Sequence, residues 1–478
     1  MTRRTKIVCT LGPASSDPKV LARMIEAGMD VVRVNFSHGT SEEHAKRVDM
    51  IRSLARSAGR TIGVLMDLQG PKIRIGKFEH GKTMLKPGAK FILDATCKLG
   101  NDERVGLDYV SLPEDVRPGD TLLLNDGLIV LTVISVEGPQ IHTIVDQGGV
   151  LSNNKGINRK GGGLSAPALT EKDMEDIRTA AELKADYLGV SFPRSGEDIE
   201  WARSLLHKAG GKALICAKIE RAEAITALEE IIDASDVIMV ARGDLAVEVG
   251  DAVIPALQKQ MIRLSRARNK LVITATQMME SMINSPIPTR AEVSDCANAV
   301  LDGTDAVMTS AETAAGQFPV ETVHAMARVC IEAEKADLAS SEQRRAGDDA
   351  GRDVESAIGR AVMSTANYLP IKAIAALTQS GKTAQLMSRN DSMVPIYALT
   401  PLVETRRRVT LFRGVYPVNF AVKSKDPEET LNAAEDELLR RGAVQVGDLI
   451  IITIGEPFGK AGGTNTMKIV RVGEHRKP

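Results

Sequence analysis

Apolar runs and helix-like stretches alternate in the first part of the chain. Three apolar runs, at 6–12, 30–37 and 61–68, are separated by segments whose apolar residues recur with helical spacing. This alternation predicts β/α units whose strands are parallel and buried on both faces. Between residues 70 and 165 the pattern changes to short β-like runs separated by Gly, Pro and Asn turns, which predicts an inserted β domain.

The β/α alternation resumes after Pro167 and continues to residue 339. Five more strand candidates lie in this part, at 186–192, 213–219, 236–243, 271–276 and 306–310. With the three earlier runs they make eight β/α units, which is the number in a (β/α)8 barrel.

A third domain is expected beyond the polar, Gly-rich segment 340–353, which we interpret as a linker. There a helix from Val354 is followed by further alternating strands and helices. We therefore predict an α/β protein of three domains. They are a (β/α)8 TIM barrel formed by residues 1–68 and 166–339, an inserted β-barrel-like lid domain at 69–165, and a C-terminal α/β domain at 354–478.

The composition excludes several classes of function but does not change the predicted fold. The 478 residues carry a net charge of −1, so a strongly basic face for nucleic acid is not expected. The five cysteines are scattered without a CxxC pair, which argues against a disulfide framework and favours a reducing, cytoplasmic location. The N-terminus lacks a signal-peptide pattern and no long apolar stretch exists, so no membrane partner is expected.

Candidate chemistry lies at the ends of the predicted strands, because barrel enzymes carry their reactive side chains at the C-terminal ends of strands. Side chains alternate along a strand, so Arg33, Asn35 and Ser37 should share one face of the second strand. The third strand ends at Asp67, a carboxylate directly after an apolar run. These residues would meet at one rim of the barrel.

Later strands also end in polar and charged residues. By the same alternation, Lys218 and Glu220 should share a face of the fifth strand, and Arg242 and Asp244 a face of the sixth, while the seventh ends at Thr276. Glu220 and Asp244 suit an octahedral Mg²⁺ that keeps positions open for substrate oxygens. The lysine and arginine beside them suit a transferring phosphoryl group. The alternative is a structural ion pair between Lys218 and Glu220 that closes the barrel top.

The stretch SGKT in the third domain follows a predicted strand and opens a helix. It is not a Walker A loop, because Ala376 stands where the first glycine of that motif belongs. Hydroxyls at a helix N-terminus would make a phosphate nest, although an ordinary capped turn would have a similar sequence. The residues of this candidate phosphate site are Thr378, Ser380, Gly381, Lys382 and Thr383.

Six stretches together resemble the pyruvate kinase family, in its order and spacing. They are TKIVCTLGPAS, MDVVRVNFSHG, ICAKIE, VARGDLAVE, TATQMMESM and GTNTMKIVRV. The resemblance covers essentially the whole chain. It implies transfer of the phosphoryl group of phosphoenolpyruvate to ADP, giving pyruvate and ATP in glycolysis, with Mg²⁺ or Mn²⁺ as cofactor. It also implies a homotetramer with a phosphorylated allosteric effector.

The resemblance implies roles at the barrel top, residue by residue. Arg33 would clamp the phosphoryl group, and Lys218 would stabilise its charge during transfer. Glu220 and Asp244 would hold Mg²⁺. Gly243, with Asp244, would lie against the substrate carboxylate.

The remaining implied roles concern the proton, the nucleotide and the effector. Thr276 would lie on the face where enolpyruvate takes its proton. The inserted domain would close as a lid that excludes water from the phosphoryl transfer. The nest in the third domain resembles the family's effector site. The positions that resemble nucleotide contacts are Asn35, Phe36, Ser37, His38, Arg74 and Lys155.

The segment after the third strand departs from the commoner family pattern. Potassium-dependent members read similar to DTKGPEIR, whereas this chain reads DLQGPKIR, so Leu68 replaces a threonine and Lys72 a glutamate. The chain thus resembles the subgroup that works without K⁺. The resembling K⁺ ligands are Asn35, Ser37 and Asp67, and we predict that the Lys72 ammonium near Asp67 replaces the ion. The alternative is that Lys72 is a solvent-exposed charge at the lid hinge.

Two other functions remain open on the residues alone. A Mg²⁺-dependent carbon–carbon lyase acting on a pyruvate enolate could use the same barrel top, but it would not need a lid or ADP contacts such as Lys155. A catalytically inactive phosphometabolite sensor would use only the C-terminal nest. The intact Lys218, Glu220, Asp244 and Thr276 argue against the sensor.

Overall fold

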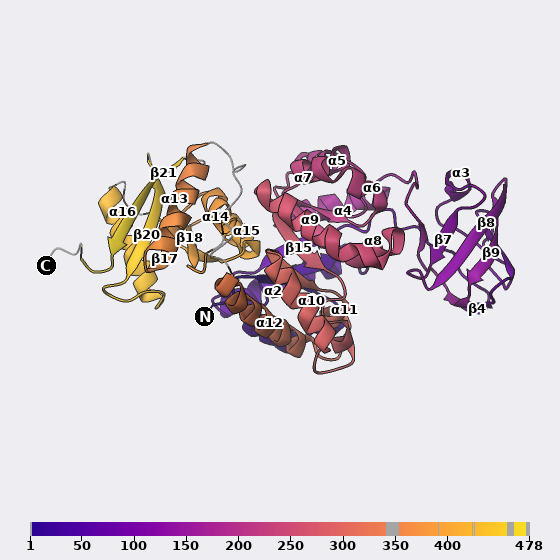
Figure 1. The fold of residues 1–478 in the computed structure, drawn as a ribbon, viewed down its shortest axis with the longest axis horizontal. Helices are drawn as coiled ribbons and strands as arrows, with labels where there is room; N and C mark the ends of the chain where they lie inside the picture. Colours follow the sequence, from indigo (N-terminus) through magenta and orange to yellow (C-terminus); the bar gives the residue numbers. More distant parts are fainter. Residues whose placement is uncertain are drawn as a thin grey trace.

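The computed structural model describes residues 2–340, 353–390, 392–422, 424, 426–456 and 463–474. Figure 1 shows three bodies in a row, with a helix-wrapped barrel between a small β domain and an α/β domain. The predicted linker falls mainly on residues 341–352, which lie outside the described residues.

The central body is a closed barrel of parallel strands, as the alternation predicted. Neighbouring strands are hydrogen-bonded in the order β1-β16-β15-β14-β13-β12-β3-β2. Every residue of β1, β3, β14 and β15 is buried, which is why these segments are continuous apolar runs in the sequence. In chain order the barrel strands are β1 (Lys6–Thr10), β2 (Val31–Asn35), β3 (Gly63–Asp67), β12 (Tyr187–Val190), β13 (Leu214–Ile219), β14 (Val237–Ala241), β15 (Leu271–Ala275) and β16 (Ala306–Thr309).

Helices surround the barrel, and several begin with a side-chain cap. Thr40 accepts the backbone N–H of Glu43, whose carboxylate accepts the N–H of Thr40, and Thr170 and Thr289 start helices in the same way. The helices are α1 (Pro18–Ala27), α2 (Ser41–Ser57), α4 (Glu171–Glu182), α5 (Gly196–Lys208), α6 (Ala222–Thr226), α7 (Leu228–Ala234), α8 (Arg242–Val249), α9 (Ile254–Ala267), α10 (Arg290–Leu301), α11 (Ala311–Ala314) and α12 (Pro319–Ser340), with 3-10 turns η1 (Pro13–Ser15), η2 (Asp251–Val253) and η3 (Glu280–Ile283).

Two strands end earlier than the sequence pattern predicted. β2 ends at Asn35, so Ser37 lies in a turn and does not follow the strand alternation. β14 ends at Ala241 and α8 begins at Arg242, so the prediction that Arg242 and Asp244 share a strand face is wrong. The cause is a tertiary contact: the backbone N–H of Gly243 leaves the strand direction and donates to the hydroxyl of Thr276 on the next strand end.

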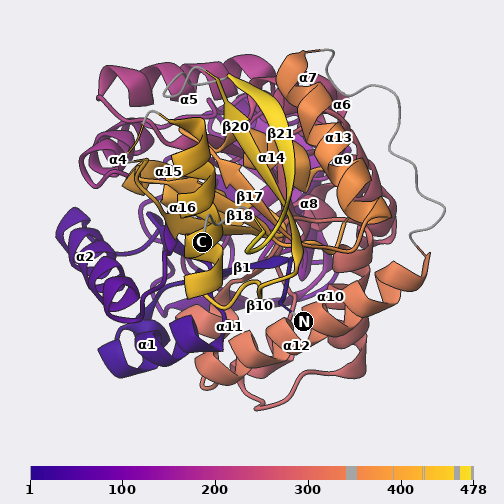
Figure 2. The ribbon, with the colours of Figure 1, turned by 90° about the vertical axis from the view of Figure 1, so that its left-hand side faces the viewer.

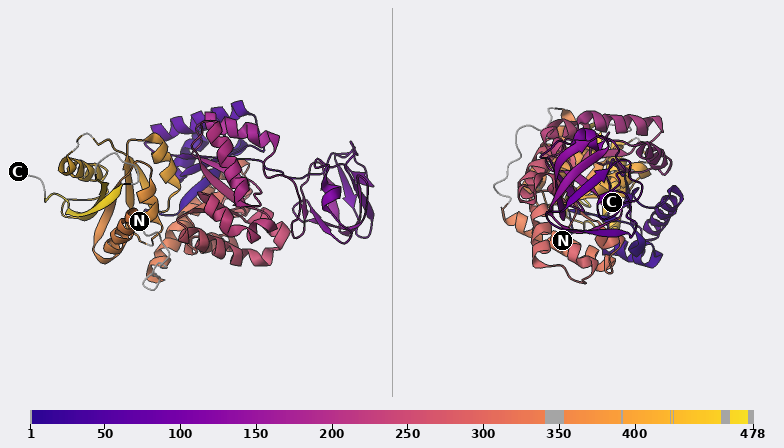
Figure 3. Two further views of the ribbon diagram at one scale, coloured as in Figure 1. Left: turned by 90° about the horizontal axis from the view of Figure 1, so that it is seen from above. Right: turned by 90° about the vertical axis from the view of Figure 1, so that its right-hand side faces the viewer.

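The inserted domain consists of two sheets with the strand orders β11-β7-β8-β9-β5-β6 and β10-β4. Alternate residues of its longest strand, Ile129, Leu131 and Val133, are buried in the core of this domain. Figure 3 shows that the domain stands away from the barrel and joins it through a narrow neck. Its elements are β4 (Lys82–Leu85), β5 (Lys90–Asp94), β6 (Arg104–Val105), α3 (Leu112–Asp115), β7 (Thr121–Leu124), β8 (Ile129–Glu137), β9 (Gln140–Gln147), β10 (Gly149–Ser152) and β11 (Ile157–Arg159).

The C-terminal domain has a sheet of order β19-β18-β17-β20-β21, in which β21 runs antiparallel to β20 and the other pairs are parallel. The helix expected from Val354 is α13, which Asp353 caps. The elements are α13 (Val354–Tyr368), β17 (Ile371–Leu377), α14 (Lys382–Ser388), β18 (Ile396–Thr400), α15 (Val403–Arg408), η5 (Val409–Leu411), β19 (Val415–Asn419), α16 (Pro427–Arg440), β20 (Leu449–Gly455) and β21 (Thr464–Arg471).

The C-terminal domain covers the end of the barrel where the strands begin, as Figure 2 shows. Lys6, the first residue of β1, donates to the backbone oxygen of Val415, and Tyr187, the first residue of β12, donates to that of Arg408. The opposite end of the barrel, where the strands finish, faces the inserted domain (Figure 1). In the described ranges no helix combines the length and the apolarity that crossing a bilayer requires.

Candidate active site

Asp67 lies at the centre of a charged cluster at the C-terminal ends of the barrel strands. Arg33 on β2 donates from Nε to Asp67 Oδ2 over 2.6 Å and from Nη1 to Thr10 Oγ1 over 3.1 Å. Asp67 is fully buried, and a Cβ at Gly189 on β12 would lie 2.7 Å from its Oδ1, so only glycine fits there. The strand-end analysis correctly brought Arg33 and Asp67 together, although Arg33 is held by a carboxylate in this structure.

Lys218 on β13 is a buried cation beside two carboxylates. Its Nζ lies 2.9 Å from Glu220 Oε1 and 3.3 Å from Asp67 Oδ1, and it donates to Ser191 Oγ over 2.7 Å. Burial opposes the ammonium charge, but Asp67 and Glu220 outweigh burial, so the pKa of Lys218 is raised. The predicted proximity of Lys218 and Glu220 is confirmed, and the lysine remains charged, as contact with a phosphoryl group requires.

Glu220 is crowded by like charges. Its Oε1 faces Lys218 and its Oε2 accepts the backbone N–H of Phe192 over 3.0 Å. Burial, joined by the charges of Asp244 and Asp67 and opposed by Lys218, raises the pKa of Glu220 to about 7. A carboxylate whose charge is disfavoured in this way would be stabilised by an additional cation.

Thr276 has an unusual backbone that places its hydroxyl against Gly243. Its φ is +67°, a strained value for a β-branched residue. Its Oγ1 accepts the N–H of Gly243 over 2.8 Å. Arg242 stabilises this turn by donating to the backbone oxygens of Ala275 (3.2 Å) and Thr276 (2.7 Å), and it pairs with Asp295 at 2.7 Å. Arg242 therefore stabilises the turn at Thr276 through hydrogen bonds to its backbone. The sequence had instead predicted that Arg242 lies beside the carboxylates of the metal site.

Lys72 contacts a different carboxylate from the one predicted. Its Nζ lies 3.2 Å from Asp244 Oδ1. Asp67, which Lys72 was expected to neutralise, is already paired with Arg33 and Lys218. The structure thus places Lys72 at the lid hinge, on a predicted magnesium ligand, and the exchange of Lys72 for K⁺ remains a prediction.

The carboxylates at this rim have the chemistry to hold a small divalent cation. Glu220 and Asp244 offer hard carboxylate oxygens, which Mg²⁺ and Mn²⁺ accept as ligands. The partner of Asp244 Oδ1 is the ammonium of Lys72, which lies on a long, flexible side chain. Among the described residues, no group of three or more His, Cys, Asp or Glu side chains is arranged around one metal position. Two protein carboxylates leave the other positions for substrate oxygens and water.

The predicted nucleotide positions fall into two groups. The turn after β2 presents Ser37 and His38 towards solvent, and the Ser37 N–H donates to Asn35 Oδ1 over 3.0 Å. Phe36 is buried, with its ring 5.0 Å from that of His44, so only its backbone could meet a nucleotide.

Arg74 and Lys155 form the second group, at the base of the inserted domain. Arg74 Nη1 donates to the backbone oxygen of Asn154 over 3.0 Å, and the Lys155 oxygen accepts the N–H of Ile75. In the described part of the chain, no hydrogen bond or ion pair joins these residues to the turn after β2. That the two groups contact one nucleotide remains a prediction.

Two residues at the cluster were not identified from the sequence. Ser191 and Phe192 follow β12, and they contact Lys218 through a hydroxyl and Glu220 through a backbone N–H. Ser191 directly follows Val190, the last residue of the fourth barrel strand. The same strand-end rule would have found Ser191 there.

The phosphate nest in the C-terminal domain forms only in part. Thr378 Oγ1 accepts the N–H of Gly381 over 2.9 Å, and Ser380 Oγ that of Lys382 over 3.3 Å. Gly381 has a φ of +87°, which favours glycine. The hydroxyl of Thr383 is buried and pairs with Thr464, 2.7 Å away, so it does not point into the turn.

The closed β/α barrel carries paired carboxylates and cations at the ends of its strands, where barrel enzymes place their reactive side chains. A family model described as pyruvate kinase, barrel domain, matches residues 2–323, and one described as pyruvate kinase, alpha/beta domain, matches 356–470. Pyruvate kinase II of Salmonella typhimurium is 52% identical over 476 residues, which cover 98% of this chain and 99% of that protein.

Two further relatives agree. A pyruvate kinase of Haemophilus influenzae is 52% identical, over 95% of this chain and 96% of that protein. A pyruvate kinase of Geobacillus stearothermophilus is 43% identical, over 98% of this chain and 80% of that protein. The chain belongs to the pyruvate kinase family, and it is a phosphotransferase.

Proposed function

We propose that this chain transfers the phosphoryl group of phosphoenolpyruvate to ADP and so forms pyruvate and ATP in glycolysis. The observation that carries this proposal is the position of Lys218, a charged, buried lysine between Glu220 and Asp67. A preorganised cation in a site shielded from water stabilises the charge that develops on a transferring phosphoryl group. Arg33, from β2 and paired with the other oxygen of Asp67, clamps the same group.

Mg²⁺ or Mn²⁺ is held by Glu220 and Asp244 in this proposal. A cation held there would supply positive charge that stabilises a transferring phosphoryl group. The chain's own contribution is to hold Glu220 through the Phe192 N–H and to keep Lys72 beside Asp244 until the cation binds.

Substrate orientation is assigned to the Gly243–Thr276 contact. The N-terminal turn of α8 presents backbone N–H groups that suit the substrate carboxylate. Thr276, locked by Arg242, presents its hydroxyl at the same rim, on the face where the enolate of pyruvate accepts a proton. A fixed orientation of this kind lowers the entropic cost of reaching the transition state.

The inserted domain is proposed to act as a lid. ADP would bind between the turn Asn35–His38 and the pair Arg74 and Lys155, and closing would exclude water that could otherwise hydrolyse the phosphoryl group. The domain limits proposed for this division are 1–68 with 166–339 for the barrel, 69–165 for the lid and 354–478 for the C-terminal domain.

The C-terminal domain is proposed to bind a phosphorylated allosteric effector at Thr378–Lys382, in a cytoplasmic homotetramer. The support is the turn with a glycine at positive φ and the exposed Ser380 and Lys382. Ser380→Ala should abolish activation by sugar phosphates or nucleotides and leave the maximal rate nearly unchanged. Thr383→Ala is the matched control, because its hydroxyl faces Thr464.

A coupled assay tests the proposed reaction. Pyruvate formation from phosphoenolpyruvate should require both ADP and Mg²⁺, and ATP should appear in equal amount. The alternative, a carbon–carbon lyase, would form pyruvate from a larger substrate without ADP, and the family assignment does not favour it. Pyruvate formation that proceeds equally without ADP would refute the kinase proposal.

A further inference from the structure

The turn after β12 connects the catalytic cluster to the lid hinge. Ser191 Oγ accepts from Lys218 Nζ over 2.7 Å and donates to the backbone oxygen of Leu68 over 2.8 Å. The next residue, Phe192, donates its backbone N–H to Glu220 Oε2 over 3.0 Å. Ser191 and Phe192 thus contact Lys218, the predicted metal ligand Glu220, and Leu68, where the chain leaves the barrel for the lid.

Phe192 holds this position with a strained backbone. Its φ is +54°, in the left-handed region that a bulky side chain seldom adopts. Strain of this kind persists only where the surroundings fix the conformation, and it is concentrated at functional sites. Only 8% of the residue is exposed, so its surroundings supply that constraint.

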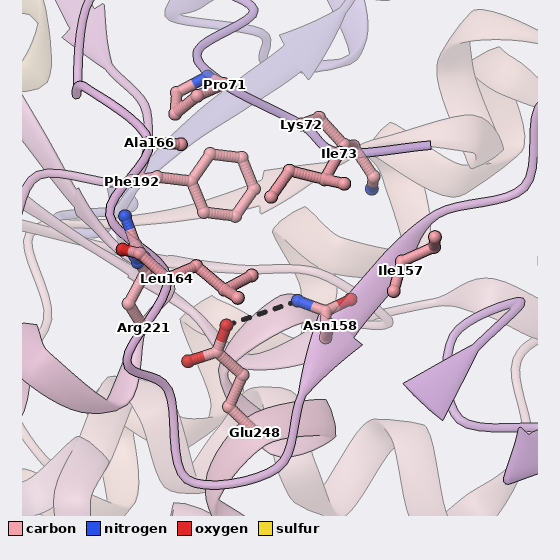
Figure 4. Close-up of a pocket in the computed structure, with 10 residues that line it drawn as sticks. All are labelled: Pro71, Lys72, Ile73, Ile157, Asn158, Leu164, Ala166, Phe192, Arg221 and Glu248. Carbon is pink, nitrogen blue, oxygen red and sulfur yellow. Dashed lines mark hydrogen bonds between the residues drawn. The ribbon is translucent and has the colours of Figure 1, made fainter. Parts of the chain in front are cut away.

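The ring packs between the two segments that lead into and out of the lid. Figure 4 shows that the ring lines a pocket together with Pro71 and Ile73 of the outgoing segment and Leu164 and Ala166 of the returning segment. The outgoing segment also approaches closely at Gly70, where a Cβ would lie 3.1 Å from the ring and 2.7 Å from Ser191 Cβ. A movement of either segment must therefore repack this ring.

We propose that Phe192 is a positioning residue that couples the position of the lid to the orientation of Glu220. The ring responds to the two hinge segments, and its backbone N–H orients the metal carboxylate. The inference rests on the proposed function, because it assigns Glu220 to the metal and the inserted domain to the lid. It goes beyond that function by naming the residue through which the two communicate.

The physical argument concerns one peptide group. Without the ring, the backbone at Phe192 relaxes towards negative φ, and this rotation turns the peptide between Ser191 and Phe192. Glu220 Oε2 then loses its donor, while Oε1 keeps Lys218 at 2.9 Å. Groups that orient a metal ligand typically change metal affinity 10- to 100-fold when they are removed.

The test measures Mn²⁺ binding to the metal-free enzyme by electron paramagnetic resonance, with no substrate present. Phe192→Ala should raise the Mn²⁺ dissociation constant about tenfold. Spin labels on the lid and the barrel should show that Mn²⁺ changes the lid–barrel distances in the wild type, and that this response is lost in Phe192→Ala. Phe420→Ala is the matched control, because Phe420 has the same 8% exposure but lies in the C-terminal domain.

Two further variants separate the ring from the backbone. Phe192→Gly tolerates positive φ, so it should retain more Mn²⁺ affinity than Phe192→Ala while losing the lid response. Phe192→Leu keeps an apolar side chain in the hinge pocket, so it should recover most of both properties. If Phe192→Ala does not fold, the Mn²⁺ affinity and the lid response of Phe192→Gly and Phe192→Leu are compared with those of the wild type instead.

The proposal is overturned if the Mn²⁺ dissociation constant of Phe192→Ala stays within twofold of the wild type, or if Phe192→Gly keeps the lid response of the wild type. It is also overturned if Phe420→Ala weakens Mn²⁺ binding as much as Phe192→Ala, since the effect would then be a general loss of stability. Failure of the proposed reaction is a separate result: it would appear as absent turnover of phosphoenolpyruvate and ADP in the wild type, whatever the variants bind.

Discussion

The two ends of the barrel both bury charged side chains, but they satisfy them differently. At the end where the strands begin, Arg389, which follows α14, pairs with Asp305, which precedes β16. Asp305 also accepts the backbone N–H groups of Val272 (2.9 Å) and Arg413 (3.3 Å), and Arg389 donates to the Lys270 oxygen over 2.8 Å. This ion pair is enclosed between two domains.

At the end where the strands finish, several carboxylates lie close together, and some of them remain accessible to solvent. Glu220 has a pKa raised to about 7 by burial and then by the carboxylates of Asp244 and Asp67, despite Lys218. Asp244 and Lys72 remain partly exposed. The comparison indicates that a closed, fully bonded ion pair joins domains, whereas a cluster left with excess like charge is suited to a cation and a substrate.

The largest expected effect follows from removing the cation at the crowded end. Lys218→Met should lower kcat by about 10³, because one preorganised charge at a transition state typically contributes 10²–10³ or more in rate. The protein should remain folded, since the barrel strands on either side keep their apolar packing. Steady-state kinetics with far-ultraviolet circular dichroism of the same preparation measures both. Near-normal turnover of a folded variant would contradict the role given to Lys218.

The opposite result is expected at the enclosed end. Asp305→Ala leaves the Arg389 guanidinium buried without its carboxylate, which should cost about 3–5 kcal/mol of stability. Denaturant unfolding, followed by fluorescence at several wavelengths because a multidomain chain need not unfold in one step, measures the loss. The kcat of the folded enzyme should change less than twofold. A large fall in kcat without a loss of stability would show that the comparison is wrong.

The sequence predicted the barrel well because buried parallel strands are continuous apolar runs. Each of the predicted runs contains one observed barrel strand, and the helix start at Thr40 and Glu43 is visible as a capping box. The inserted domain could be recognised in the sequence as a separate unit because its strands bury every second residue and are joined by turns.

The sequence predicted which residues lie near one another at the rim better than it predicted the contacts between them. Arg33, Asp67, Lys218 and Glu220 share a rim because all parallel strands end at the same side. The partner of Lys72 could not be predicted, because its contact with Asp244 spans 172 positions and depends on the path of the hinge.

Other features of the site escaped prediction because neighbouring strands create them. The early end of β14 depends on the hydroxyl of Thr276, which no local pattern reveals. The positive φ of Thr276 and Phe192 is likewise imposed by tertiary packing, since neither residue type favours it.

The unfolding free energy should depend on pH through Asp186, a buried carboxylate at the end of the barrel where the strands begin. Burial raises the pKa of Asp186 to about 7, against the lowering effects of the Val64 N–H and of Arg407 and Arg52. The folded state therefore holds a proton that the unfolded state has released, so the unfolding free energy should fall as pH rises from about 4 to about 7.

Asp186→Asn provides the check on this titration, because the amide keeps the shape of the side chain without its charge. The slope of unfolding free energy against pH should become smaller between pH 4 and pH 7 in this variant. The control is Asp305→Asn, which lies at the same end of the barrel but should lower stability across the whole range. An unchanged slope in Asp186→Asn would assign the pH dependence to other groups.

The smallest expected effect concerns potassium and the hinge lysine. Turnover in a potassium-free buffer, with a bulky organic cation holding ionic strength constant, should rise less than twofold on adding KCl. The structure gives two reasons. Asp67 is already paired with Arg33 and Lys218, and Leu68 is buried at 1% exposure where an oxygen ligand would be needed.

Lys72 adds a third reason, although it lies on Asp244 and not on Asp67. A K⁺ ion 4 Å from its ammonium would be repelled by about 4 kcal/mol at an effective dielectric constant near 20. Lys72→Glu combined with Leu68→Thr removes that repulsion and restores an oxygen ligand, so this variant should be slower without KCl and respond to it. Leu68→Thr alone is the control, because it keeps the ammonium and should remain insensitive. A large KCl activation of the wild type would show that neither Lys72 nor the ion pairs at Asp67 replace the ion.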